Sequence, residues 1–492
     1  MTVSRLSARV GALAFLALAS GCTVGPDYAG PPSLAGAGQP GSQFVRADDP
    51  ALTSAPGLAR WWESLSDPLL TRLVEDALAH SPTIDLARAR IAEARGKLAE
   101  GRAGLAPSAS PNAMYVHAEA PGLDMSSLTG GSSDGEDTAS GGGTSLDFYN
   151  VGANVSWEPD LFHAKRSGIE ATAATLGARY ADLADAQVSL SAQVAQSYVN
   201  LRDAESRARI SRDAVARQRQ SLGLTRQRLA AGTASQLEVE RLQGELAASE
   251  ARIIPLDAQV LLYRNALAIL TGQAPGALDE ALARAAPVPL PPASVAIGDP
   301  AALIARRPDI RAAERALAAA TATVRAREAQ RLPGIRFTGI LGIGGTHPED
   351  VLDPGNLVAL VMPQISWPLL DFGKSKAVVK QAEAQRDQAE AQYRQKVLVA
   401  LQDAEDSLAR FGATRRQLAR LLASQRSAHA AAELNRQRFH AGTSNLIDQL
   451  DIERQALSAD ADVEQAKAQL TIDYIAVQKA LGLGWQDNTD AG

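Results

Sequence analysis

The chain has 492 residues, of which 46% are hydrophobic, 21% are charged and only 4% are aromatic. The formal net charge of −6 is small and argues against nucleic-acid binding as the main activity. A single cysteine, Cys22, excludes an intramolecular disulfide, and the six histidines lack the spacing of metal ligands. No set of nucleophile, base and orienting residue is found, so we expect neither a metal site nor an enzyme.

Residues 1–21 have the pattern of a signal peptide. Arg5 and Arg9 precede an apolar stretch that is too short to span a bilayer. The residues Leu-Ala-Ser-Gly before Cys22 resemble a bacterial lipobox, although Ala19 stands where Leu is more usual. We therefore expect Cys22 to carry a lipid that holds the chain on a membrane. The alternative is a spare thiol behind an ordinary cleavage site. Residues 22–60, rich in Pro, Gly and Ser, predict a lipidated extended segment.

The rest of the chain reads as two structural repeats, 61–290 and 291–486, with a C-terminal tail at 487–492. Each repeat opens with helices. The first predicts a short amphipathic helix from Trp61 to Ala79 and a longer one from Thr83 to Gly104. The counterpart of the longer helix lies between Pro308 and Pro333.

A β-hairpin is predicted next in each repeat, at 108–158 and 334–367, because the hydrophobic period changes from 3.6 to 2. The Gly/Ser-rich run from Gly130 to Gly143 predicts a long exposed loop in the first hairpin. The expected apolar faces consist of Met114, Val116 and Ala118; of Tyr149, Val151, Ala153, Val155 and Trp157; and of Ile335, Phe337, Leu341 and Ile343.

Strands of about ten residues suit a membrane β-barrel, although a water-soluble sandwich shows the same alternation. Four strands cannot close a barrel, and an open sheet edge is not tolerated in lipid. If the strands span a membrane, several chains must therefore pool them.

Each repeat ends in a helical hairpin, and the two tips, near 226–238 and 436–448, lie 210 residues apart (436 − 226). Gly232 and Gly442 suit the left-handed position after a helix. Ser235 with Glu238 forms a capping-box pattern, and Asn445 with Asp448 occupies the same two places.

The hairpin arms are unusually long. No proline occurs from Asp371 to the C-terminus, and in the first repeat only Pro255 interrupts the return arm. No run of 18 apolar residues occurs, which excludes a helical membrane span. A packing seam along the second arm is expected at Tyr393, Val397, Leu401, Ala404, Leu408, Phe411, Leu418, Leu421 and Ala428.

Together these features resemble the outer membrane factor (TolC-like) family, and most closely the NodT-type outer membrane lipoproteins of tripartite (RND-type) efflux systems. The resemblance rests on four segments and covers essentially the whole mature chain. They are Gly21 to Tyr28, Arg306 to Ile310, Trp367 to Gly373, and the two Ala-Gly-Thr tips.

The resemblance implies a mainly α fold with a membrane β-barrel. In a homotrimer, four strands per chain would form a shared twelve-stranded barrel, and the duplicated hairpins would form an α-barrel tunnel in the periplasm. The implied function is a passive exit duct for small toxic compounds or drugs, in the outer membrane of a Gram-negative cell, with no cofactor beyond the lipid on Cys22.

The resemblance also implies two partners, a periplasmic adaptor (membrane fusion) protein and an inner-membrane pump. The adaptor would contact the tips at Arg226, Leu229, Gly232, Thr233, Arg436, Phe439, Gly442 and Thr443. Simple helix capping is the alternative role of these residues. In relatives an apolar residue, an Asp and an Arg close the tunnel, and these fall here on Ile447, Asp451 and Arg454. The alternative is that acids here merely favour the start of a helix.

Two competing functions remain open. The same fold serves type I protein export and metal-ion export. A lipid-anchored periplasmic coiled-coil scaffold without a pore would also have long helices. The alternating strands, placed twice in corresponding positions, favour the duct over the scaffold.

Overall fold

The computed structural model describes residues 24–31, 43–120 and 144–485. The expected signal peptide, Cys22, the Gly/Ser-rich run and the C-terminal tail lie outside these residues. The chain forms two compact units, and each contains parts of both sequence repeats. Unit 1 comprises Met1–Gly30, Ala94–Leu176 and Ala316–Ala389; unit 2 comprises Pro31–Glu93, Gly177–Arg315 and Glu390–Gly492.

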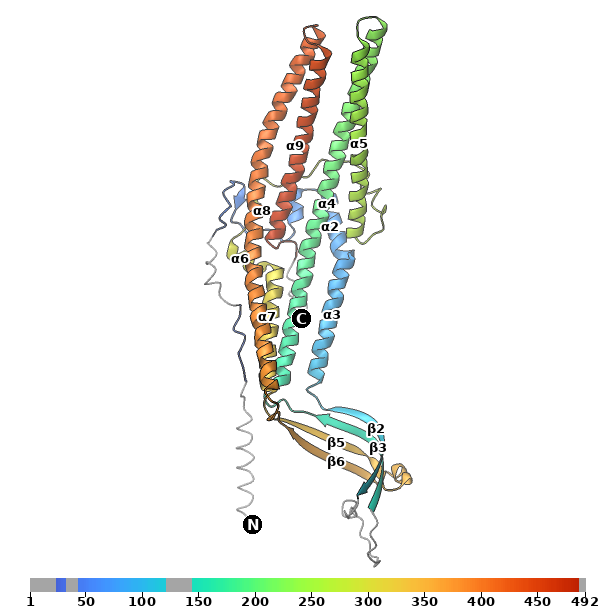
Figure 1. Ribbon diagram of the computed structural model, residues 1–492, viewed down its shortest axis with the longest axis vertical. Helices are drawn as coiled ribbons and strands as arrows, with labels where there is room; N and C mark the ends of the chain where they lie inside the picture. Colours follow the sequence, from blue (N-terminus) through green and yellow to red (C-terminus); the bar gives the residue numbers. More distant parts are fainter. Residues whose placement is uncertain (1–23, 32–42, 121–143, 486–492) are drawn as a thin grey trace, which may run out of the picture. The chain divides into compact units, whose positions relative to one another are not determined.

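Unit 1 contains a four-stranded antiparallel sheet (Figure 1). Its strands are β2 (Ser108–Ala120), β3 (Thr144–Trp157), β5 (Gly334–Gly345) and β6 (Leu357–Ser366), in the order β2-β3-β5-β6. A short 3-10 helix, η3 (Pro348–Leu352), lies in the connection between β5 and β6. Both strand hairpins thus lie where the sequence predicts them. Within the chain, β2 and β6 are the edges of the sheet.

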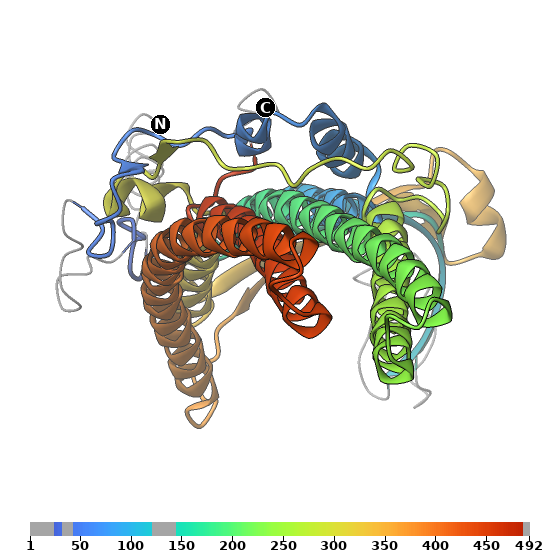
Figure 2. The ribbon, with the colours of Figure 1, turned by 90° about the horizontal axis from the view of Figure 1, so that it is seen from above.

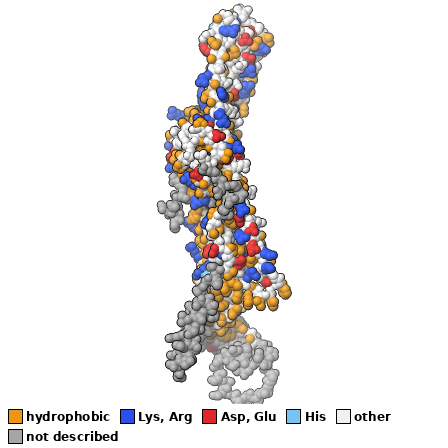
Figure 3. Space-filling view, turned by 90° about the vertical axis from the view of Figure 1, so that its left-hand side faces the viewer, with side chains coloured by type: hydrophobic (Ala, Val, Ile, Leu, Met, Phe, Trp, Pro, Cys, Tyr) orange, Lys and Arg blue, Asp and Glu red, His pale blue; other side chains and the backbone are white. Residues whose placement is uncertain are grey.

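The register gives the sheet one mainly apolar face and one face on which apolar and polar residues are mixed. Directly opposite residues share a face, and in all three pairings odd-numbered residues lie opposite odd-numbered ones, as in Tyr115–Tyr149 and Val151–Ile343. The odd-numbered face carries Tyr115, Tyr149, Val151, Val155, Trp157, Ile335, Phe337, Leu341, Ile343, Leu357, Val361 and Ile365. In the space-filling view, hydrophobic side chains gather around the sheet, whereas charged side chains are scattered over the helices (Figure 3).

One predicted strand face is wrong. Met114 lies opposite Asn150, and Val116 lies opposite Phe148, so Met114, Val116 and Ala118 are on the even-numbered face with Asn154 and Ser156. The register of β2 against β3 decides which residues of β2 lie on the apolar face of the sheet. The alternation of apolar and polar residues within β2 is too weak to predict this. The expected faces of β3 and β5 are confirmed.

Two long helical hairpins dominate unit 2, and their ends repeat at an offset of 210 residues. They are α4 (Ala164–Ala230) with α5 (Gln236–Leu270), and α8 (Lys374–His440) with α9 (Leu446–Ala480). The N-terminal parts of α4 and α8 belong to unit 1. Each has 67 residues, or roughly 100 Å at about 1.5 Å per residue. Seen from above, α8, α9, α4 and α5 follow one another in an arc, with α8 and α5 at its ends (Figure 2).

Shorter helices precede each sheet hairpin. The first repeat has η1 (Trp61–Leu65), α2 (Pro68–His80) and α3 (Pro82–Ala103), and the second has α6 (Pro300–Arg306) and α7 (Pro308–Ala329). Two-residue strands β1 (Leu52–Thr53) and β4 (Val295–Ala296) pair in parallel. The single helix predicted from Trp61 to Ala79 is wrong. Asp67 interrupts it, because its carboxylate accepts bonds from the backbone N–H groups of Leu69 and Leu70 and starts α2 afresh.

The core of unit 2 packs the N-terminal helices against the hairpins. Trp61 is 1% exposed and meets Tyr474 of α9 edge to face, with ring centroids 6.2 Å apart. The predicted seam along α8 is buried at Tyr393, Val397, Ala404, Leu408 and Phe411, whereas Leu401, Leu418, Leu421 and Ala428 are half-buried. The seam is therefore tight near the core and loosens toward the tip.

Helix α5 departs from two expectations. It continues through Pro255 instead of stopping there. It also contains an 18-residue stretch of mean hydropathy 1.3 that is only 11% buried, so by length and composition alone this helix could cross a membrane. Apolar side chains that pack against another protein surface give a helix the same composition.

Candidate functional site

The two hairpin tips have the same backbone geometry. Gly232 and Gly442 have φ angles of 74° and 75°, in the left-handed region that a side chain disfavours. The N–H of Thr233 donates to the carbonyl of Arg228 at 2.8 Å, and that of Thr443 donates to the carbonyl of Arg438 at 2.9 Å. The N–H of Gly232 donates to the carbonyl of Leu229, and the N–H of Gly442 donates to the carbonyl of Phe439. These bonds complete a Schellman motif at each tip.

Each returning helix is capped as the sequence predicts. The Ser235 hydroxyl accepts from the N–H of Glu238 at 3.3 Å, and the Glu238 carboxylate accepts from the N–H of Ser235 at 2.7 Å. At the second tip the Asn445 side chain accepts from the N–H of Asp448 at 2.8 Å. The capping role of the tip residues is therefore real, whatever else they do.

The residues predicted to contact an adaptor are mostly exposed. Leu229 and Phe439 are half-buried, and Leu229 packs against a small cluster of Leu222, Val239 and Leu242. The exposed ones are Arg226, Gly232, Thr233, Arg436, Gly442 and Thr443. Thr233 and Thr443 also donate their hydroxyls to the preceding helix, each at 3.1 Å.

The three predicted gate residues share one exposed face of α9, because they are spaced by four and three residues. Ile447 is 50% exposed. Arg454 donates to Asp451 at 3.0 Å, and both side chains are more than half exposed. Within one chain this ion pair is therefore a solvated surface contact, which contributes little to stability.

A buried polar network in the second tip was not predicted. Asn435 of α8 and Gln449 of α9 are each 6% exposed, and the Asn435 amide donates to the Gln449 carbonyl at 2.9 Å. Ser444 donates to Asn435 at 2.9 Å, and Gln449 donates to Glu453 at 2.5 Å. Nothing in the local sequence pattern marks Asn435 or Gln449, because the two side chains meet only when the hairpin closes.

Arg307, in one of the segments that carry the resemblance, ties helix ends together. It forms a bidentate pair with Asp309 at 2.9 and 3.0 Å and donates to the carbonyl of Ala480, the last residue of α9, at 2.9 Å. Burial alone would raise the pKa of Asp309, but the hydrogen bond and charge of Arg307 outweigh it and lower that pKa. Burial, reinforced by the charge of Asp309, raises the pKa of Asp185. The Arg307–Asp309 pair thus joins the start of α7 to the end of α9, away from the tips.

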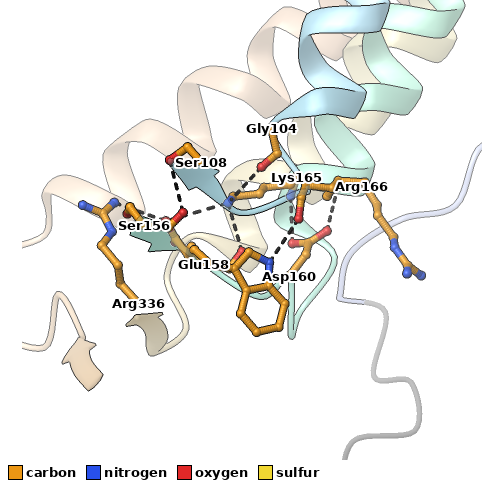
Figure 4. A network of polar contacts seen from close by, with 10 residues as sticks. Gly104, Ser108, Ser156, Glu158, Asp160, Lys165, Arg166 and Arg336 are labelled. Carbon is orange, nitrogen blue, oxygen red and sulfur yellow. Dashed lines mark hydrogen bonds and ion pairs between the residues drawn. The ribbon is translucent and has the colours of Figure 1, made fainter. Parts of the chain in front are cut away.

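The turn that leads from β3 into α4 is held by a polar network (Figure 4). Asp160 accepts from the N–H groups of Lys165 and Arg166 at 2.9 and 2.7 Å, which starts α4. The Lys165 ammonium donates to the carbonyl of Glu158 at 3.0 Å, and Glu158 pairs with Arg336 of β5 at 3.2 Å. At the corresponding turn from β6 into α8, Asp371 accepts from the N–H of Ser375 at 2.7 Å.

A sheet with one apolar face and long capped helical hairpins together define the class of outer membrane channels. A family model described as "Outer membrane efflux protein" matches residues 73–273 and 300–483. The chain belongs to this family and is the outer membrane channel component of a tripartite efflux pump. Homologues in the family function with an adaptor and an inner-membrane pump.

Similar proteins agree with this assignment over nearly the full length. "Nodulation protein T" of Rhizobium leguminosarum bv. trifolii is 28% identical over 97% of this chain and 98% of its own. The structure of the outer-membrane channel OprN has a TM-score of 0.84 and 31% identity, covering 94% of this chain and all of that one. The open state of the MtrE channel of Neisseria gonorrhoeae has a TM-score of 0.79 and 26% identity, covering 95% and 100%.

Proposed function

We propose that this channel works as a homotrimer whose four-stranded sheets close into one twelve-stranded barrel. The open edges β2 and β6 support this, because unpaired strand edges are not tolerated in lipid. The odd-numbered face supplies the apolar exterior: Val361 is 68% exposed and Ile365 is 75% exposed in the single chain. The even-numbered face would line the pore with polar groups such as Asn154, Ser156 and Thr338.

Aromatic pairs mark both ends of the apolar face. Tyr115 stacks on Tyr149 at 4.9 Å, and Trp157 stacks on Phe337 at 5.9 Å. Tyr149 and Trp157 are eight positions apart on β3, or roughly 26 Å at about 3.3 Å per residue. Strands in membrane barrels tilt by about 40°, which leaves roughly 20 Å across the membrane, close to the usual apolar band of about 25 Å. The aromatic pairs would form the girdles at the two interfaces.

The exposed stripe on α5 is the proposed contact between copies in the tunnel. Ile254 is 71% exposed, Leu262 is 65% exposed and Ile269 is 58% exposed. Because α5 and α8 lie at opposite ends of the arc (Figure 2), α5 of one copy would meet α8 of the next, where Leu398 and Leu434 are exposed. Burying these side chains would stabilise the trimer.

A lipid on Cys22 would anchor the N-terminus, with no other cofactor. Cys22 lies outside the described residues, but the segment just after it is held within unit 1. Asp27 accepts from Arg325 of α7 at 2.7 Å. Gly25, with a φ of 100°, lies so close to α7 that an added Cβ would be 2.1 Å from the Glu328 carboxylate. The anchor would therefore emerge beside the unit that carries the membrane strands.

The tips are the proposed contact with the adaptor, and the exposed face of α9 is the proposed gate. Arg226, Thr233, Arg436 and Thr443 are available for the adaptor contact because they are exposed and backed by rigid caps. Around a threefold axis, three copies of Asp451 and Arg454 would face one another in a narrow opening, and Ile447 would seal it. Rearranging those contacts would open the duct to small toxic compounds.

The decisive measurement is single-channel conductance of the detergent-extracted protein in a planar bilayer. We expect a small conductance from the wild type and a clear rise in the double variant Asp451→Ala, Arg454→Ala. Equal conductance of the two proteins would preserve the duct and contradict the gate.

A scaffold without a pore predicts no conductance from either folded oligomer. Exposed charges elsewhere on the hairpins provide a matched control. The pair Arg219→Ala, Glu250→Ala removes an exposed ion pair of 2.7 Å between α4 and α5, away from the predicted gate face, and should leave conductance unchanged.

A further inference from the structure

The second hairpin tip contains a hydrogen-bond chain that runs in one direction. The Ser444 hydroxyl donates to the Asn435 carbonyl, the Asn435 amide donates to the Gln449 carbonyl, and the Gln449 amide donates to the Glu453 carboxylate. An ionised carboxylate accepts hydrogen bonds but cannot donate them, so the chain of hydrogen bonds ends at Glu453. The network joins the tip loop, α8 and the first two turns of α9.

At the corresponding positions of the first hairpin, the two helices pack together without hydrogen bonds between these side chains. Thr225 stands where Asn435 does, and its hydroxyl donates within its own helix to the carbonyl of Ser221 at 3.0 Å. Val239 stands where Gln449 does and is 3% exposed. With Leu222 and Leu242 it forms a dry apolar seam.

These two seams restrain the helices differently. Apolar contacts are non-directional, so an apolar seam restrains the register only through the fit of its side chains. A buried amide pair is satisfied in one register only, and any slip leaves two buried polar groups without partners. A single buried polar residue can fix register in this way in coiled coils.

The register also fixes how α9 is rotated. Gln449 and Glu453 belong to the network on the α8 side, while Leu446 and Leu450 pack against the apolar cluster of the first hairpin. Both contacts leave a third face, with Ile447, Asp451 and Arg454, exposed. Loss of the network would free α9 to turn that face.

We propose that Asn435 and Gln449 are positioning residues that fix the register of α9 against α8 and so hold the gate face in its closed orientation. The part of this inference that concerns the gate rests on the proposed function. The part that concerns register stands on the network alone.

The test compares three variants. Asn435→Leu with Gln449→Leu removes both partners together, so thermal stability should be kept or raised while the resting conductance rises above that of the wild type. Asn435→Gln with Gln449→Asn keeps an amide pair across the seam and should conduct like the wild type. Gln449→Leu alone leaves Asn435 without its partner and should lower the melting temperature.

Register is measured separately from conductance. Spin labels at Arg426→Cys and Gln455→Cys, both exposed and on opposite arms of the hairpin, report the distance between α8 and α9. The double-leucine variant should show a shifted or broadened distance, and the amide-swap variant should not. An unchanged distance in the double-leucine variant overturns the inference.

The matched control leaves both contacts of α9 intact. Arg219→Ala with Glu250→Ala, which removes an exposed ion pair of the first hairpin, should leave both the conductance and the distance between α8 and α9 unchanged. If the double-leucine variant shifts the distance while Asp451→Ala, Arg454→Ala conducts like the wild type, the gate assignment fails and the register role survives. A rise in conductance with an unchanged distance would overturn the register role instead.

Discussion

The two helical hairpins of this channel share their backbone signals but differ in what fills the space between their arms. Arms of 67 and 35 residues begin and end at an offset of 210, and a glycine with φ near 75° turns each tip. Behind the first tip the arms meet through leucine and valine side chains. Behind the second they meet through two amides.

The halves of the returning helices nearer the core differ as well. The stretch of α5 before Leu270 leaves Leu261, Leu262 and Ile269 exposed, whereas in α9 Val463, Tyr474 and Ile475 are buried. This half of α9 is thus enclosed by its own chain, whereas the same half of α5 leaves large apolar side chains exposed. The two hairpins share the glycine and the capping positions that shape their tips. They differ in the side chains packed between their arms and in the side chains exposed on the returning helix, so two similar hairpins can have different roles.

The largest expected difference between the two hairpins is in the stability lost when an apolar side chain between the arms is truncated. Leu242 is 1% exposed, so Leu242→Ala should lower the free energy of unfolding by about 2–5 kcal/mol through lost burial and a new cavity. Ile452, at the same place in the second hairpin, is half-buried, so Ile452→Ala should cost clearly less. Denaturant unfolding of the detergent-extracted protein, followed by circular dichroism, measures both. Equal losses would contradict the distinction between a dry seam and a polar one.

The tips themselves should respond alike, because their geometry is the same. An added Cβ at Gly232 or Gly442 would meet nothing within 4 Å, so Gly232→Ala and Gly442→Ala should each cost only the left-handed φ, about 1 kcal/mol. Thermal unfolding of the two variants gives the comparison. A much larger loss at one tip would show that a contact not seen in the single chain depends on that glycine.

The smallest expected effect is a pH dependence of the cap at the first tip. The hydrogen bond from the Ser235 backbone lowers the pKa of Glu238. A lowered pKa means that the cap stabilises the folded state at neutral pH, and that this contribution is lost as the pH falls below about 4. Amide hydrogen exchange at the two tips, as the pH falls through this range, should show Ser235 losing protection in the wild type and not in Glu238→Gln. The amide of Asn445 does not titrate, so the second cap itself serves as the reference.

Much of the fold was predictable because its signals are local. Glycine, proline and capping residues act on their own few neighbours, so the hairpin tips and the ends of α3 and α7 could be located from sequence. The same local signal was available at Asp67-Pro68 and was missed, since the apolar period continues across it. Pro255 was read as a break, yet a long helix supported on both sides of a proline can continue through it.

The remaining features depend on residues that meet only after folding. The face of β2 is set by its pairing with β3, not by its own alternation. Asn435 and Gln449 are ordinary polar residues in an exposed-looking helix pattern until the hairpin closes and buries both. The proposed gate residues could be named from resemblance, but the buried amide pair beside them becomes visible only in the three-dimensional contacts of α8 with α9.

The parity of the sheet register has a practical consequence. Because odd residues face odd residues across all three strand pairs, residue number alone tells an experimenter which side of the barrel wall a side chain occupies. A cysteine scan along β3 or β6 should thus alternate residue by residue between reagents that dissolve in lipid and reagents that travel through water. One inserted residue in either strand would invert that alternation from the insertion onward, which would allow the wall to be mapped by chemistry alone.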